Sequence, residues 1–179
     1  DANRDFSSSR SQKRLVGVFG EFRADWKNTL FLTLSGRNDW SSTLPLANRS
    51  YFYPSVSGSF VFTELFDELP EWLSFGKLRG SWARVGKDTS PYDLETSLWP
   101  SQEFLGGLSG VSNYWQSGNP ALKPEITEST ELGLEMRFFN NRLGFDWTYY
   151  KSETENQIAS PRLSNANGSI LSSINSGSV

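Results

Sequence analysis

The segment 37–62 reads RNDWSSTLPLANRSYFYPSVSGSFVF, and its second half alternates between two kinds of side chain. Between residues 52 and 62 every second residue is apolar or glycine, whereas most of the residues between them are serines. Alternation over this length predicts a β-strand with one apolar face and one small polar face. The apolar face has to contact either a protein core or lipid, and the other segments of the chain decide between these two surroundings.

The same alternation recurs along the chain and predicts about six strands in three hairpin-like pairs. Their ranges are 14–26, 29–39, 51–62, 75–86, 126–139 and 142–155. Tight turns are expected after the first strand, at residues 27–29, and after the fifth strand, at the asparagine pair 140–141, because asparagine tolerates positive φ.

The remaining segments differ from this pattern. Residues 63–74 have the spacing of a short helix, with Thr63 as the expected N-cap and Pro70 as the expected end. Residues 87–125 are predicted to form one long loop, which is uncommon in a compact domain and usually functional or disordered. The chain from residue 157 onward is rich in serine and asparagine and is also predicted to be loop.

The lengths of the connections also form a pattern. The connections after the first, third and fifth strands are short, whereas those after the second, fourth and sixth are long and polar. Short turns at one edge and long loops at the other are typical of outer-membrane β-barrels. The predicted fold class is therefore all-β: an antiparallel, up-and-down segment of a transmembrane β-barrel.

Charged residues divide between the two faces of the predicted strands. The face opposite the apolar one carries Glu21, Arg23, Asp25, Lys77, Arg79, Glu131, Glu135, Arg137 and Asp146. On the apolar face, the exceptions Arg84, Glu128 and Lys151 lie toward the long-loop end. A Lys or Arg at the bilayer midplane of a barrel strand costs about 2–4 kcal/mol, and less near the interface. We therefore expect the apolar face to contact lipid and the charged face to line the lumen.

The composition excludes several classes of function. The net charge is −3, so no basic surface for nucleic acid is expected. The chain has no cysteine and no histidine, which removes thiolate chemistry and the commonest metal ligand and general base. Paired carboxylates such as Glu131 and Glu135 can hydrolyse glycosides, but the arginines on the same face favour a charged wall. We expect no enzyme activity, no cofactor and no metal site.

The long loops contain the candidate ligand contacts, which combine aromatic rings with amide groups. These residues are Trp99, Phe104, Asn113, Tyr114, Trp115 and Gln116. An aromatic face suits the C–H face of a sugar ring, and amides suit its hydroxyls. Alternatively, these aromatic residues pack within the loop or against a partner protein. For the chain as a whole, the alternative is a soluble carbohydrate-binding β-sandwich with an aromatic inner face, which explains the alternation equally well.

Four stretches carry a resemblance: GRNDWSSTLP followed by NRSYFYPSVSGSFVF, LSFGKLRGSWARVGKDTSPY, NPALKPEITESTELGLEMRFF and NRLGFDWTYYKSETENQI. They resemble the SusC/RagA family of TonB-dependent outer-membrane transporters. The resemblance covers most of the chain, from the first strand to the end of the sixth. It implies a barrel of about 22 strands, of which about six lie here, and a plug domain that is absent from this sequence. We therefore expect an internal fragment from the later half of the barrel.

The resemblance also implies a function. Members of this family resemble gated importers in the outer membranes of Bacteroidota, which take up glycan oligosaccharides or peptides. They pair with a SusD-like surface lipoprotein that covers the extracellular mouth. Import is energised through TonB, which acts on an N-terminal region that is not in this sequence. The charged face would then contact the plug domain.

Overall fold

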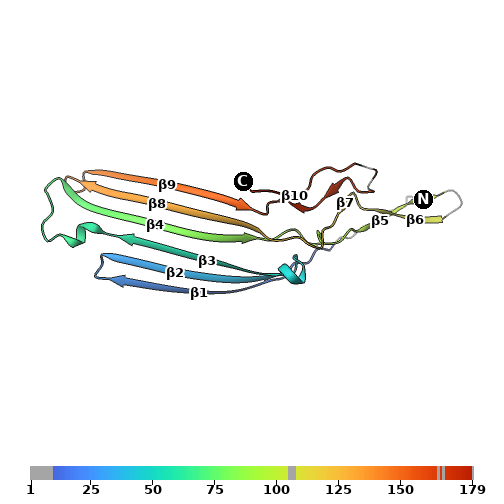
Figure 1. Ribbon diagram of the computed structural model, residues 1–179, viewed down its shortest axis with the longest axis horizontal. Coiled ribbons are helices and arrows are strands. Elements are labelled where there is room, and N and C mark those ends of the chain that lie inside the picture. Colours follow the sequence, from blue (N-terminus) through green and yellow to red (C-terminus); the bar gives the residue numbers. More distant parts are fainter. Residues whose placement is uncertain (1–9, 105–107, 165, 167, 179) are drawn as a thin grey trace, which may run out of the picture.

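The computed structural model describes residues 10–104, 108–164, 166 and 168–178. Its main feature is one six-stranded sheet in which sequence neighbours lie side by side (Figure 1). The strands are β1 (Leu15–Trp26), β2 (Leu30–Ser41), β3 (Ser50–Phe60), β4 (Leu73–Lys87), β8 (Glu125–Phe138) and β9 (Leu143–Glu155). Each pairs with the next in antiparallel register. The prediction of an all-β, antiparallel, up-and-down sheet is confirmed.

The tight turns at one end of the sheet pass through the left-handed backbone region, mostly at asparagine. Lys27 and Asn28 have φ values of 51° and 55°, and Asn140 and Asn141 have values of 54° and 64°. The Asn28 backbone N–H also donates a hydrogen bond of 3.1 Å to the carboxylate of Asp25. Because asparagine adopts this region at low cost, these positions reverse the chain within a few residues.

The connection between β3 and β4 contains less helix than the sequence suggests. A single 3₁₀ turn, η2 (Phe62–Leu65), is followed by irregular chain up to β4. Thr63 is not the N-cap, because that position is occupied by Val61 and has no side-chain cap. The buried Thr63 hydroxyl instead accepts a hydrogen bond of 3.2 Å from the Gly76 backbone N–H. A threonine that bonds to a neighbouring strand cannot also cap a helix.

Both long connections at the other end contain short strands that the sequence analysis did not predict. The added elements are β5 (Leu98–Phe104), β6 (Leu108–Asn113), β7 (Gln116–Ser117), β10 (Ile158–Ala159), β11 (Leu171–Ser172) and β12 (Ile174–Asn175). β5 and β6 form a hairpin that extends away from the main sheet (Figure 1). β7 and β11 pair in parallel and therefore join the β4–β8 connection to the segment after β9.

The described residues form a single layer with little buried core. Their buried apolar residues are Leu44, Tyr51, Val61, Leu122 and Ile126, which lie at the ends of the sheet rather than at its centre. Every residue of β1 is exposed. A β-sandwich buries one face of each sheet against the other, so the β-sandwich alternative is wrong.

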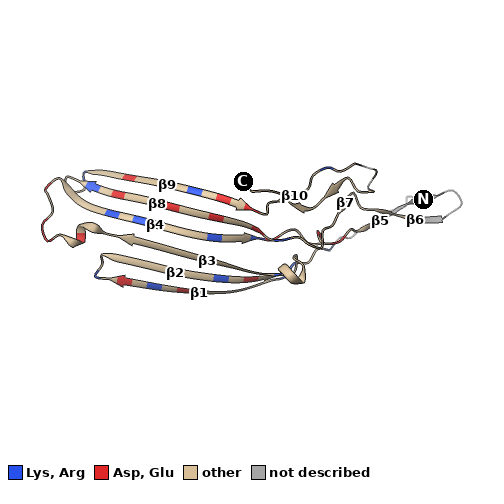
Figure 2. Cartoon of the chain, viewed as in Figure 1, with Lys and Arg blue, Asp and Glu red and all other residues tan. Residues whose placement is uncertain are grey.

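Charged residues occur along most of the long strands, including β1, β4, β8 and β9 (Figure 2). In the part of the chain that the structure describes, no helix combines the length and the apolar character needed to cross a membrane.

Candidate functional site

The register of the six strands gathers one set of polar residues on a single face, which we call the charged face. Its members include the nine charged residues predicted from the sequence, namely Glu21, Arg23, Asp25, Lys77, Arg79, Glu131, Glu135, Arg137 and Asp146. One cross-strand row, for example, places Arg23 in line with Ser57 and Glu131. The face is therefore continuous across the sheet.

The most extended interaction on the charged face joins β4 to β9 across the intervening strand. The Arg79 guanidinium donates a hydrogen bond of 2.9 Å to the Asp146 carboxylate and one of 2.7 Å to the Thr148 hydroxyl. Between them lies Gly133 on β8, where an added Cβ would lie 2.2 Å from Arg79 Nε. Glycine therefore leaves the space through which Arg79 passes. The sequence analysis missed Gly133, since a glycine in a strand does not reveal which side chain crosses it.

Other charged residues of this face pair over shorter spans. Glu135 accepts a hydrogen bond of 2.9 Å from Arg137 and lies 3.5 Å from Lys77 Nζ. On β1, Arg23 Nε lies 2.5 Å from a carboxylate oxygen of Glu21. These groups neutralise one another, which is the arrangement of a charged wall rather than of a catalytic carboxylate pair. In the described ranges, no group of three or more acidic side chains has the geometry to hold a metal ion.

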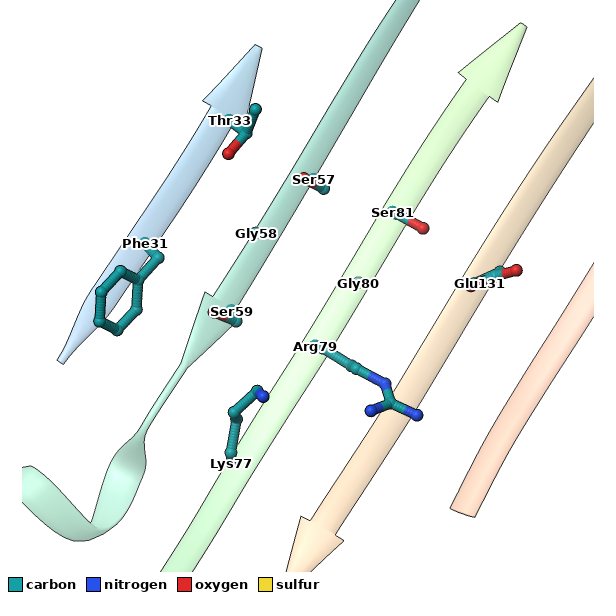
Figure 3. Close-up of a pocket in the computed structure, with 10 residues that line it drawn as sticks. All are labelled: Phe31, Thr33, Ser57, Gly58, Ser59, Lys77, Arg79, Gly80, Ser81 and Glu131. Carbon is teal, nitrogen blue, oxygen red and sulfur yellow. The ribbon is translucent and has the colours of Figure 1, made fainter. Parts of the chain in front are cut away.

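A shallow depression of about 320 Å³ lies on the charged face across β2, β3, β4 and β8 (Figure 3). Its floor consists of small residues, including Ser57, Ser59 and Ser81, on neighbouring strands. Phe31 borders it on the β2 side, whereas Lys77 and Arg79 come from β4. The depression offers hydroxyl groups, the positive charges of Lys77 and Arg79 and the carboxylate of Glu131 to a polar partner. Sequence reasoning missed it, because serine alternation marks the polar face of any strand.

The loop candidates form a second polar and aromatic group beyond the end of the sheet. Asn113, Tyr114 and Trp115 line a cavity of about 380 Å³, and the rings of Tyr114 and Trp115 meet edge to face at 5.7 Å. Trp115 is 60% exposed. The Gln116 amide donates a hydrogen bond of 2.9 Å to the Ser173 hydroxyl, so this group holds the loop together. Trp99 and Phe104 belong to β5, but their side chains lie outside the described part of the structure.

The described parts of the β4–β8 connection and of the segment after β9 fold together as one unit, which we call the double loop (residues 88–104, 108–124, 156–164, 166 and 168–178). The Trp115 carbonyl accepts hydrogen bonds of 2.8 Å from the backbone N–H groups of both Ile170 and Leu171. The Asn175 side chain accepts a hydrogen bond from the Lys123 N–H and donates one to the Lys123 carbonyl, each 2.9 Å long. The aromatic group is therefore positioned by two segments that are distant in sequence.

Asp88 fastens the base of the double loop to its neighbours. Its carboxylate lies 2.7 Å from Lys13 Nζ and accepts hydrogen bonds of 2.5 Å from Ser41 and 3.1 Å from Thr43. Burial alone would raise the pKa of Asp88, but the hydrogen bonds from Lys13, Ser41 and Thr43 and the charge of Lys13 outweigh it and hold the pKa below its ordinary value. The ionised carboxylate therefore stabilises this end of the sheet.

Comparisons with known proteins support one interpretation of this two-faced sheet. The whole chain, residues 1–179, matches the family model described as TonB dependent receptor-like, beta-barrel. The chain is 29% identical over 155 residues to the TonB-dependent receptor P26 of Formosa agariphila, a match that covers 85% of this chain and 16% of that protein.

Two solved structures extend the comparison. The RagAB peptide importer in its closed-closed state aligns with a TM-score of 0.83 and 26% identity, covering 92% of this chain and 18% of that one. The siderophore receptor PirA from Pseudomonas aeruginosa aligns with a TM-score of 0.63 and 19% identity, covering 93% of this chain and 29% of that one, which is a likeness of fold alone. The chain thus spans less than a third of each of these proteins.

Proposed function

Because this chain belongs to the family of TonB-dependent receptor-like β-barrels, we propose that it supplies six neighbouring strands and the double loop of an outer-membrane importer. Proteins of this family are outer-membrane receptors and transporters rather than enzymes, and the outer membrane is the location of this chain. The observation that carries the proposal is the single-layered sheet, which has one apolar face and one charged face and carries the β4–β8 connection and the segment after β9 at the same end.

In this proposal the apolar face contacts lipid and the charged face lines the lumen, where it contacts a plug domain. Exposed apolar side chains on one face support the lipid contact, since water would not favour them and no second layer covers them among the described residues. Paired charges such as Arg79 and Asp146 suit a wetted wall. The serine-floored depression would accept a polar group of the plug or of the solute.

The double loop is the part that we propose contacts solute or a partner lipoprotein. Long loops lie on the extracellular side of outer-membrane barrels. Exposed Trp115 beside Asn113 offers a ring and an amide, which suits a glycan oligosaccharide. The similarity to RagAB, described as a peptide importer, supports a peptide as the alternative solute. The resemblance to the SusC/RagA family supports a SusD-like lipoprotein as partner and TonB as the source of energy.

A binding experiment on the full-length receptor tests the role of the aromatic group. Trp115→Ala should weaken binding of the preferred solute by about tenfold, since a lost aromatic contact costs on the order of 1 kcal/mol or more. Titrating a panel of oligosaccharides and short peptides, with and without the partner lipoprotein, would identify the solute class. Val111→Ala is the matched control, because Val111 is 70% exposed on β6, in the same β4–β8 connection as Trp115. Equal binding by wild type and Trp115→Ala would contradict a solute contact at this residue.

A further inference from the structure

The apolar face consists of cross-strand rows that the strand register defines. One row contains Trp26, Leu30, Phe60, Leu78, Leu134 and Trp147. Trp26, Leu78 and Trp147 are at least half exposed. In an outer-membrane barrel such a face contacts the acyl chains.

The apolar region on this face runs obliquely to the strands. On β9 the face becomes charged at Lys151, and the row of Lys151 leads through Thr130 and Trp82 to Phe22 on β1. From Phe22 the same face of β1 stays apolar as far as Val16, which is six residues further. Six residues correspond to about 20 Å along a strand, and the five spacings between β1 and β9 to about 24 Å.

The border of the apolar region is therefore inclined by about 40° to the perpendicular of the strands. If this border lies parallel to the membrane plane, the strands are tilted by the same angle from the membrane normal, which agrees with the tilt of about 35–45° for strands in outer-membrane barrels. The charges on β4, β8 and β9 therefore lie at the same membrane depth as apolar residues that are further along β1. They mark the border of the acyl region on the long-loop side, which is the level of the headgroups of the outer leaflet.

Four charged residues form a group at this border, which we call the headgroup patch: Arg84, Glu128, Lys151 and Glu153. Arg84, Glu128 and Glu153 occupy one cross-strand row, and Lys151 lies in the next row toward the apolar region. Lys151 forms an ion pair with Glu153. Arg84 Nε lies 3.5 Å from Glu128 Oε1, and the Arg84 side chain is 41% exposed.

Arg84 differs from the arginines of the charged face. Arg79 and Arg137 each donate hydrogen bonds to carboxylates. For Arg84, no hydrogen bond of the guanidinium is found within the described residues, and its Nε is buried without a hydrogen-bond partner. A guanidinium that is ion-paired through its buried Nε alone keeps the donors of its two terminal nitrogens for another acceptor.

We propose that Arg84 binds the phosphate of a lipid headgroup in the outer leaflet. The guanidinium fork matches a phosphate bidentately, and Lys151, which is ion-paired with Glu153, lies in the adjacent row of the same border. The apolar rows below the patch, which include Trp82, Leu132 and Tyr149, accommodate the acyl chains of the same lipid. Glu128 competes with the phosphate for Arg84 and so moderates the affinity. The proposal rests on the outer-membrane location and does not depend on import.

The test measures lipid binding to the full-length receptor, delipidated in a neutral detergent, by native mass spectrometry and titration calorimetry. The probes are dioctanoyl phosphatidic acid, dioctanoylglycerol with the same chains but no phosphate, and inorganic phosphate. Wild type should bind the phosphatidic acid at least tenfold more tightly than either comparison probe. Arg84→Gln should lose most of this preference. Arg79→Gln on the opposite face of the same strand should retain it.

The other outcomes overturn the proposal. An equal loss in Arg84→Gln and Arg79→Gln would indicate general electrostatic attraction, and binding of inorganic phosphate as tightly as the lipid would indicate a free anion site. If Arg84→Gln does not assemble, Glu128→Gln decides the question. This variant removes the competing carboxylate and should tighten phosphatidic acid binding several-fold, whereas unchanged or weaker binding rejects the site. Solute uptake is measured in parallel and should be the same in Glu128→Gln and wild type.

Discussion

Arg79 crosses β8 directly over Gly133 and reaches Asp146 on β9, where the two charged groups are 2.9 Å apart. This contact ties together two strands that are not paired with each other. Side chains on the charged face therefore stabilise the sheet in addition to the backbone hydrogen bonds. The contact also requires glycine at position 133, because a side chain there would meet Arg79.

Substitution of Gly133 by alanine should break this contact. The added Cβ would lie 2.2 Å from Arg79 Nε and 2.6 Å from its Cγ, so the Arg79 side chain has to move away from its position over residue 133. Because both partners are partly exposed, we expect a loss of about 1 kcal/mol or less in the free energy of unfolding. Urea unfolding of the wild-type and Gly133→Ala full-length receptors in detergent measures this difference in the free energy of unfolding.

A double-mutant cycle separates this effect from that of a glycine replacement in general. Asp146→Asn should cost stability in wild type but little in the Gly133→Ala background. Gly144→Ala on β9 is the matched control, because a Cβ there has no neighbour within 4 Å. Additive losses in the cycle would show that Gly133 does not act through Arg79.

Leu34→Arg should prevent assembly of the receptor in the membrane. Leu34 lies on the apolar face, between Phe22 and Val56, and a charge near the bilayer midplane of a barrel strand costs about 2–4 kcal/mol. The neighbouring change Thr33→Arg places the same group on the charged face and should be tolerated. Heat-modifiable mobility of the receptor in outer-membrane fractions reports assembly, and similar yields of both variants would argue against a lipid-facing Leu34.

Acid should loosen the end of the sheet that carries the double loop. The pKa of Asp88 is lowered in the folded protein, so its stabilising effect is present above its unfolded pKa of about 3.9 and is lost as pH falls through the lower folded value. Hydrogen bonds to a charged group contribute about 1.5–3 kcal/mol. Limited proteolysis between pH 7 and pH 3 should therefore show more rapid cleavage of the double loop at the acid end.

Asp88→Asn should make the loop sensitive to protease already at pH 7 and flatten this pH profile. Asp67→Asn serves as control, because Asp67 is exposed in the connection between β3 and β4 at the opposite end. A wild-type profile that does not change between pH 7 and pH 3 would show that another contact holds the loop.

Asn175→Ala should uncouple the two segments of the double loop. The Asn175 side chain forms hydrogen bonds with the backbone N–H and carbonyl of Lys123. It also donates a hydrogen bond of 2.8 Å to the Asn156 carbonyl. Hydrogen exchange should become faster at Ile170 and Leu171, whose N–H groups bond to Trp115, and exchange within β1 should stay unchanged. Ser176→Ala is the control, because Ser176 donates through its backbone to Gln157. Unchanged exchange in Asn175→Ala would mean that β7 and β11 suffice to hold the segments together.

The six long strands, their two faces and the turns at asparagine could be predicted from the sequence alone. Phe52, Val56 and Phe60 share one face and Ser55 and Ser57 the other because successive side chains of a strand alternate, whatever the neighbouring strand is. The turn at Asn140 is local in the same way, since it depends on the residue's own backbone preference. The proposed lumenal and lipid-facing roles rest on the free-energy cost of placing charge in a bilayer.

Which residues of different strands meet is visible only in the folded structure. Three contacts join segments that are separated in sequence. Arg79 passes over Gly133, the Gly76 backbone N–H donates a hydrogen bond to Thr63, which therefore does not cap a helix, and β7 pairs with β11. Such contacts depend on register and on the path of long connections, and a local period carries no information about either. The double loop was therefore predicted as two separate loops, although its hydrogen bonds make it one structure.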